Sequence, residues 1–269
     1  MINASRRKRA AIYVGLGLVL YLAFLVAYTP ATLLAEGAAR LSNGALTLAQ
    51  PRGTLWRGTG ELHGGGRAAG ARHIGTLQWR INPWWLLAGR AQFSLQLNGP
   101  AARGQAAVRV ARRRLSVQGL DAALPANLAS LVYAPAVFFE PRGTIELRAP
   151  SIDVSAAGLA TNLEAQWRGA GGRFTGPGSL GDYRIELNGQ GETATIRLNT
   201  LRGDLELTGQ GQWRVTGDGA INFTGSAVPR GNAAQLEPLL RPLGRDLGNG
   251  RREIRFNGRF PLLQQLGYS

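Results

Sequence analysis

Apolar and polar side chains alternate along most of this chain after residue 45. In residues 92–98 the apolar residues are Phe93, Leu95 and Leu97, and polar residues separate them. The same period of two recurs at residues 162–168, 183–187 and 194–198. Such alternation is typical of strands with one buried and one solvated face. Because glycine-rich turns separate these runs at intervals of roughly 8–12 residues, we expect antiparallel hairpins and an all-β domain.

The strand pattern is written twice, with a period of about 90 residues. Residues 50–55 (QPRGTL) are echoed by 140–145 (EPRGTI), 78–80 by 166–168, and 93–99 by 183–189. We therefore expect two β repeats, residues 46–139 and residues 140–269, the second with a short helix and a terminal strand. The expected repeat-equivalent core residues are Trp79, Trp167, Leu95 and Ile185.

The duplication predicts an extended, curled antiparallel β meander with short helical segments. Whether the repeats form one continuous sheet or two stacked sheets stays open at this point. The apolar face must be covered by the short helices, by the other sheet or by a ligand. A curled sheet with an apolar inner face is either a packed core or a groove for an apolar partner.

The amino-terminal 45 residues have a different character. Arg6, Arg7, Lys8 and Arg9 precede an uncharged apolar run that extends from residue 10 to residue 35. A helix of ~20 apolar residues can span a bilayer, and flanking basic residues favour the cytoplasmic side. We expect a cytoplasmic tail (1–10), a single transmembrane helix (11–29) and a periplasmic helical linker (30–45). A cleaved signal peptide is the alternative, but its apolar core is usually only about 7–15 residues long.

Composition narrows the setting. The chain has no cysteine, which excludes disulfides, a thiol nucleophile and cysteine metal sites. Lys8 is its only lysine among 31 basic residues. This arginine bias suggests a GC-rich bacterial genome, and thus a bacterial inner membrane with the carboxy-terminal domain in the periplasm.

The net charge of +15 invites a nucleic-acid interpretation. The arginines are spread along the chain, whereas a nucleic-acid interface concentrates charge on one face beside aromatic platforms. We therefore expect no nucleic-acid partner and assign the arginines to solvated strand positions. Attraction to anionic lipid headgroups, worth ~1 kcal/mol per residue close to the surface, would be an additional effect of this charge.

No residue pattern indicates catalysis. His63 and His73 are the only histidines and lie near glycine-rich turns, where Glu61 is the sole nearby carboxylate. Neither histidine has the nucleophile context that an acyl-transfer triad requires. Several aspartates adjoin glycines, which is typical of turns. The sequence predicts no enzyme activity, no cofactor and no metal site.

One apolar segment has no counterpart in the second repeat. Residues 82–89 (NPWWLLAG) carry the candidate interface residues Trp84, Trp85 and Leu86. Exposed aromatic residues are enriched at protein interfaces, so a docking role is one interpretation. Capping of the internal core is the other.

These features together resemble protein N of the bacterial type II secretion system. The resemblance is carried by the short basic amino terminus, the apolar span, residues 53–60 (GTLWRGTG) and residues 82–89. It implies a non-enzymatic accessory subunit of the inner membrane, whose periplasmic domain contacts other secretion subunits, either of the inner-membrane platform or near the secretin. The alternative hypothesis is a periplasmic groove for lipid or another apolar ligand, similar to AsmA-like proteins.

Overall fold

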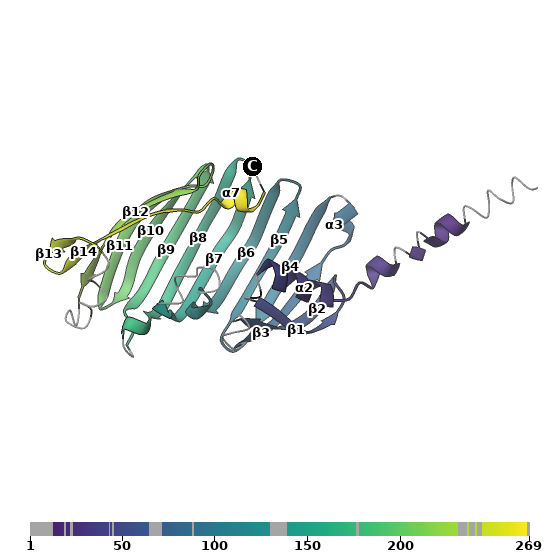
Figure 1. Ribbon diagram of the computed structural model, residues 1–269, viewed down its shortest axis with the longest axis horizontal. Helices are drawn as coiled ribbons and strands as arrows, with labels where there is room; N and C mark the ends of the chain where they lie inside the picture. The colour runs from purple at the N-terminus through teal and green to yellow at the C-terminus, as the bar shows by residue number, and fades with distance from the viewer. Residues whose placement is uncertain are drawn as a thin grey trace, which may run out of the picture.

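The chain forms one long open sheet with a helical segment leading into one end of it (Figure 1). The computed structural model describes residues 13–18, 20–21, 24–42, 44, 46–64, 72–87, 89–129, 139–175, 178–230, 236, 240 and 244–267. Of the predicted span 11–29, residues 13–18, 20–21 and 24–27 are helical. No helix within the described residues is both long and apolar enough to cross a bilayer. The transmembrane anchor is thus not confirmed and stays a prediction.

The described strands form a single 14-stranded antiparallel sheet in the order β1-β2-β3-β4-β5-β6-β7-β8-β9-β10-β11-β12-β14-β13. Nearly every strand pairs with the next along the chain, so the architecture is a meander. The strands are β1 (Leu46–Gly53), β2 (Arg57–Gly64), β3 (Arg72–Ile81), β4 (Arg90–Asn98), β5 (Arg103–Ala111), β6 (Arg114–Pro125), β7 (Arg142–Ser155), β8 (Gly158–Gly171), β9 (Gly181–Gly191), β10 (Thr193–Gly203), β11 (Leu205–Arg214), β12 (Ala220–Pro229), β13 (Asp246–Gly248) and β14 (Arg251–Arg259).

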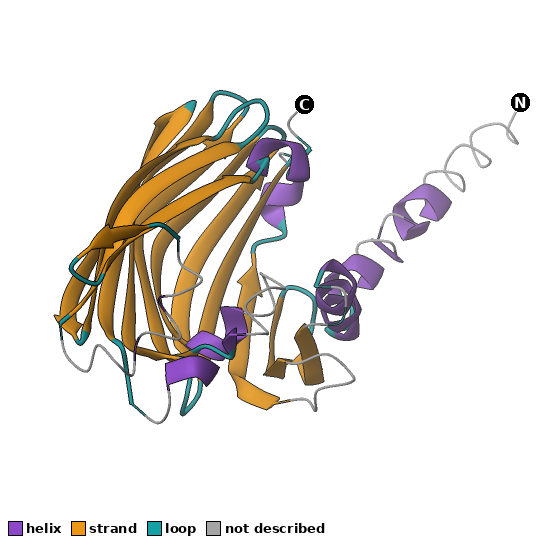
Figure 2. Cartoon of the chain, turned by 60° about the vertical axis from the view of Figure 1, so that its left-hand side comes forward, coloured by secondary structure: helices purple, strands orange, loops and turns teal. Residues whose placement is uncertain are grey.

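Short helices flank this sheet. They are α2 (Thr32–Leu41), α3 (Trp84–Leu87), α7 (Leu262–Gln265) and the 3₁₀ turns η1 (Ala126–Leu128) and η2 (Arg173–Thr175). The prediction of a β domain is confirmed. The two repeats form one continuous sheet and not two stacked sheets, because β6 and β7 pair along most of their lengths. The sheet is less curled than predicted: it twists (Figure 2) but is neither closed nor strongly curled.

The two sequence copies have matching backbone features. Gln50 and Glu140 both have positive φ, of 47° and 49°, and the glycines three residues later have φ of 98° and 100°. A residue with a Cβ adopts this region only at a cost, so glycine suits position 53 at the end of β1 and position 143 at the irregular start of β7. β2–β6 of the first copy correspond to β7–β11 of the second. Because β6 and β7 are neighbours in one sheet, the division at residues 139–140 into two units stays a prediction.

The cross-strand register between β8 and β9 is shifted by two residues relative to that between β3 and β4. Trp79 lies opposite Leu95 on β4, whereas Trp167 lies opposite Tyr183 on β9. Ile185 instead lies opposite Ala165 and is 40% exposed. Ile185 therefore does not occupy the core position expected for it. A two-residue shift keeps each side chain on its face of the sheet, so alternation alone cannot detect it.

The buried residues gather in three clusters, and the register places them on one face of the sheet. One cluster joins Ala31 before α2 to Leu48, Trp79 and Ile81. A second includes Tyr183 and Leu205 beneath Leu236 and Leu240, and a third includes Trp213 beneath Leu263 of α7. Between the covering segments the same face is open, and Val110, Ile185 and Phe256 are 41%, 40% and 47% exposed.

Candidate functional site

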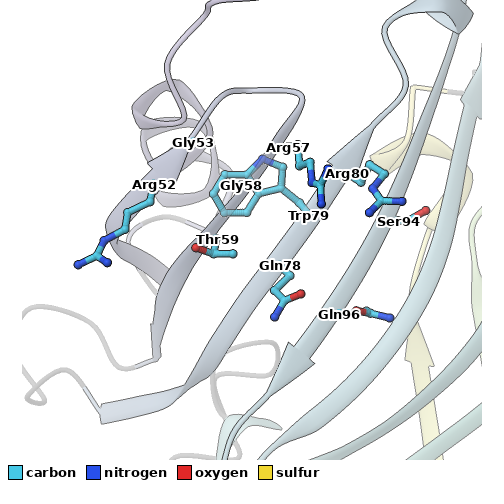
Figure 3. Close-up of a pocket in the computed structure, with 10 residues that line it drawn as sticks. All are labelled: Arg52, Gly53, Arg57, Gly58, Thr59, Gln78, Trp79, Arg80, Ser94 and Gln96. Atoms are coloured by element: carbon cyan, nitrogen blue, oxygen red, sulfur yellow. The ribbon is translucent and has the colours of Figure 1, made fainter.

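A hollow of about 510 Å³ lies over the opposite, polar face of β1–β4 (Figure 3). Cross-strand register builds it from two rows of side chains. Arg52, Thr59, Gln78 and Gln96 form one row, and Arg57, Arg80 and Ser94 form the other. Gly53, Gly58 and Trp79 complete the lining. Strand alternation alone places these polar groups on a common face.

The turn between β1 and β2 shapes one wall of this hollow. Gly53 has a φ of 98°, which an L side chain rarely adopts. A Cβ at Gly58 would overlap both the Arg52 carbonyl oxygen and the Trp79 ring. The Trp79 indole N–H donates to the carbonyl oxygen of Thr54 at 3.2 Å, which ties β3 to the turn. The glycines of the GTLWRG motif are therefore required by close backbone and ring contacts.

The same turn holds the segment that leads into the sheet. The indole N–H of Trp56 donates to the Val26 carbonyl oxygen at 2.7 Å, and the Leu55 N–H donates to the Thr29 carbonyl oxygen at 2.8 Å. Pro30 and Thr54 form an antiparallel bridge. The carboxy-terminal end of the predicted membrane span is consequently fixed to the rim of the arginine-lined hollow.

Arginine side chains in the hollow have no carboxylate partner among the described residues. Arg57 and Arg80 are directly opposite each other on β2 and β3, and both are exposed. Like charges in this arrangement destabilise a strand pair. Within the part of the chain that the structure describes, no carboxylate forms an ion pair with Arg52, Arg57 or Arg80.

Several arginines of the second copy, in contrast, form ion pairs with acidic side chains. Ion pairs join Arg148 and Arg168 to Glu146, Arg184 to Glu164, Arg202 to Asp182, Arg214 to Asp218, Arg230 to Glu206 and Arg255 to Glu253. Two hollows over β10–β12, of about 400 and 500 Å³, are lined mainly by neutral polar side chains, and Arg197 is the arginine among their described lining residues. The unpaired arginine cluster of the first hollow is therefore not repeated there.

Asp182 is the most enclosed of these carboxylates. Burial alone would raise the pKa of Asp182. Hydrogen bonds from the Gly169 N–H, at 2.7 Å, and from Arg202 Nε, at 2.6 Å, outweigh burial, and with the charges of Arg202 and Arg168 they lower that pKa below its usual value. Asp182 is thus a structural anion that closes the irregular end of β8 and β9.

The predicted interface residues follow the carboxy-terminal end of β3, the end at which Trp79 and Arg80 line the first hollow. α3 exposes Trp84 by 77% and Trp85 by 41%, while the side chain of Leu86 lies outside the described residues. The two tryptophans do not cap the core, so the capping alternative is not supported. Trp85 lines a second hollow, of about 550 Å³, together with Arg90, Arg109 and Arg114.

The other predicted site residues are placed as follows. Trp79 is 4% exposed, and Leu95 and Trp167 are partly buried against apolar clusters. Arg6, Arg7, Lys8 and Arg9 lie outside the described residues. His63 and His73 are cross-strand neighbours with ring centroids 5.3 Å apart. The described residues contain no group of three side chains suited to hold a metal ion.

Sequence reasoning missed the uneven distribution of acidic residues. Residues 46–125 contain eleven arginines but only Glu61 and Asp121 as acids, whereas residues 140–259 contain fifteen arginines and thirteen acids. Counting arginines alone shows an even spread. Counting acids in each half would have located the charge excess in β1–β6.

Comparison with known proteins identifies the family. The family model described as type II secretion system (T2SS), protein N, matches residues 44–255, which is most of the chain. No curated protein and no solved structure matches it. The matched region spans β1–β13 and the start of β14 and includes the GTLWRG turn and the exposed tryptophans. This is a family of secretion components of the bacterial envelope and not a known enzyme family. The chain belongs to the type II secretion system protein N family.

Proposed function

We propose that this protein is a non-enzymatic accessory subunit of the type II secretion system, anchored in the inner membrane with its sheet in the periplasm. Family membership supports a role in secretion and suggests other secretion subunits as partners. The basic amino terminus and the following apolar run support the anchor. In this role the sheet binds other secretion subunits, either those of the inner-membrane platform or those near the secretin.

The exposure of Trp84 and Trp85 carries this proposal. Two adjacent tryptophans at 77% and 41% exposure are unusual on a surface that faces only water. Tryptophan is among the residues that most often dominate binding energy at protein interfaces. α3 is only four residues long and follows β3, so it presents both rings at the margin of the sheet.

Photo-crosslinking in the native bacterium tests this role. A photoreactive amino acid at position 84 is expected to crosslink to a secretion subunit, and the same group at Phe256, 47% exposed in β14, serves as the matched control. The double variant Trp84→Ala/Trp85→Ala is expected to reduce secretion of the exported proteins while the protein level stays unchanged. Crosslinks to no secretion subunit, together with normal secretion by the variant, would overturn the proposal.

The anchor has its own test. Because the chain lacks cysteine, single cysteines at Ser5 and Thr224 report on the two sides of the membrane. In intact spheroplasts, a membrane-impermeant maleimide is expected to label Thr224→Cys and not Ser5→Cys. Labelling of both positions, or recovery of the protein in the soluble periplasmic fraction, contradicts the single-pass topology.

A second candidate function is supported by the open part of the apolar face. Val110, Ile185 and Phe256 lie on the same face as the buried clusters and are about half exposed. An apolar ligand on this face would remove them from water, with a gain of about 25 cal/mol per Å² buried. Native mass spectrometry of the full chain tests this: retained lipid that Ile185→Asp removes supports the groove. Absence of lipid under conditions that preserve the fold rejects it.

A further inference from the structure

We infer that Arg52, Arg57 and Arg80 bind the phosphate headgroups of anionic phospholipids at the membrane surface from which the sheet emerges. This inference rests on the proposed anchor. It assigns a ligand to the hollow over β1–β4, which neither the family match nor the contact role explains.

The hollow lies next to the end of the predicted membrane span. Trp56 and Leu55 are hydrogen-bonded to Val26 and Thr29, at the end of the predicted span. Arg57 follows Trp56 directly, and Arg52 precedes the same turn. The segment leaves the sheet at the end where β1–β3 lie (Figure 1). With residues 11–29 in the bilayer, these contacts hold the arginine-lined hollow next to the headgroups.

The hollow brings like charges together. Arg57 and Arg80 stand as cross-strand partners, and in Figure 3 their side chains lie beside each other over the sheet. Among the described residues no carboxylate pairs with either of them or with Arg52, so their mutual repulsion is not offset within this part of the chain. A bound anion would convert this repulsion into attraction.

The chemistry of the lining is the third argument. Guanidinium groups present planar, bidentate donors that match phosphate oxygens. The neighbouring side chains Thr59, Gln78, Ser94 and Gln96 are neutral and can donate further hydrogen bonds. None of the described residues that line the hollow is acidic. A phosphodiester headgroup therefore fits the site better than a cation or an apolar group.

A lipid is favoured over an acidic protein because the hollow is held beside residues 26–30, the exit segment that leads from the predicted span into the sheet. Headgroups surround any inserted helix at high local concentration, and each arginine near an anionic surface adds about 1 kcal/mol of attraction. An acidic protein partner would need a surface that reaches between the sheet and the bilayer. That alternative is an outcome of the test.

The experiment uses the full chain in nanodiscs made of equal amounts of phosphatidylglycerol and phosphatidylcholine. Native mass spectrometry measures the ratio of the two lipids that remain bound to the released protein. We expect enrichment of phosphatidylglycerol, which falls by at least about five-fold in Arg52→Gln/Arg57→Gln/Arg80→Gln, the effect of about one arginine near an anionic surface. The charge-matched control Arg197→Gln/Arg251→Gln/Arg259→Gln, at the far end of the sheet, is expected to retain the enrichment.

A second measurement does not require the triple variant to fold. A polarity-sensitive dye at Thr59→Cys is expected to change its emission as phosphatidylglycerol replaces phosphatidylcholine, and high salt is expected to reverse the change. The same dye at Thr224→Cys, on the polar face of β12, is expected to be unaffected.

The outcomes separate the two proposals. Failure of the full chain to enter nanodiscs of either composition overturns both the anchor and this inference. Insertion with equal retention of the two lipids and no dye response overturns the headgroup site alone. Crosslinking of residue 59 to an acidic secretion subunit in cells, without lipid enrichment, also rejects the lipid and assigns the hollow to a protein.

Discussion

Trp79 and Trp167 make corresponding hydrogen bonds in the two copies of the chain, to acceptors that differ by two positions between the aligned copies. The indole N–H of Trp79 donates to the carbonyl oxygen of Thr54, and that of Trp167 donates to the carbonyl oxygen of Arg142, in each case 25 residues earlier. Each bond ties a strand to the backbone at a PRG motif, to the threonine after the motif in the first copy and to its arginine in the second. The duplication is therefore visible in side-chain contacts as well as in sequence, and in the first copy the adjoining turn also binds the segment that precedes the sheet.

Replacement of these tryptophans by phenylalanine tests their structural weight. Trp79 is 4% exposed, so Trp79→Phe leaves the Thr54 carbonyl without its donor, at an expected cost of about 1–3 kcal/mol in the free energy of unfolding. Trp167→Phe is expected to cost less because water reaches that site. Urea unfolding of the full chain in detergent, followed by far-ultraviolet circular dichroism, measures both. Exposed Trp84→Phe is the control, and a cost for it equal to that of Trp79→Phe contradicts the assignment.

Gly58 is expected to be intolerant of any side chain. Gly58→Ala places a methyl group against the Arg52 carbonyl oxygen and the Trp79 ring, and overpacking of this kind typically costs about 1–3 kcal/mol. Gly37 in α2 has open space around it, so Gly37→Ala is expected to leave stability unchanged or to raise it by up to about 1 kcal/mol. The same unfolding assay distinguishes them. Equal effects of the two substitutions would show that the contact at Gly58 is relieved without cost.

Asp182 predicts a specific pH dependence of stability. Its folded-state pKa lies below the unfolded value, so its contribution is complete above the unfolded pKa and is lost as the pH falls through the folded pKa. Asp182→Asn is expected to lower the free energy of unfolding at neutral pH by about 1–3 kcal/mol and to flatten the acid limb of the stability profile. Asp218→Asn, which breaks the more exposed pair with Arg214, is the matched control. An unchanged acid limb in Asp182→Asn refutes this role.

Trp56 is expected to control the attachment of the exit segment. Trp56→Phe removes the hydrogen bond to the Val26 carbonyl oxygen but keeps an aromatic ring in place. Hydrogen exchange of the Leu55 amide, which donates to Thr29, is expected to quicken several-fold while exchange in β8–β10 stays the same. Unchanged protection at Leu55 would mean that the backbone bridge between Pro30 and Thr54 holds the segment by itself.

Much of the strand content could be predicted from periodicity. Alternation of apolar and polar residues placed Phe93, Leu95 and Leu97 on one face, and β4 has this arrangement. Glycine-rich turns located the hairpins because their short loops require antiparallel neighbours. The repeat of about 90 residues identified the equivalent tryptophans. These inferences succeeded because they depend on local geometry, which a period of two and a turn motif specify.

The candidate site was only partly within reach. Trp84 and Trp85 were recognised, but the pairing of Arg57 with Arg80 was not, since nothing in a sequence read strand by strand states which residues lie opposite. The equivalence of Leu95 and Ile185 failed for the same reason. Cross-strand register differs by two residues between the copies, and a shift of two leaves every side chain on the same face.

The sequence by itself determined the strand pattern, the duplication, the basic amino terminus and the family, because each is encoded in short-range periodicity or in a motif. Only the tertiary structure decided that the copies join into one open sheet, that Ile185 is exposed, and that the exit segment is bound at the edge of an arginine cluster. The physical reason is that each depends on which strands meet and in what register. Those contacts join residues far apart in the chain, such as Val26 and Trp56, and no local pattern records them.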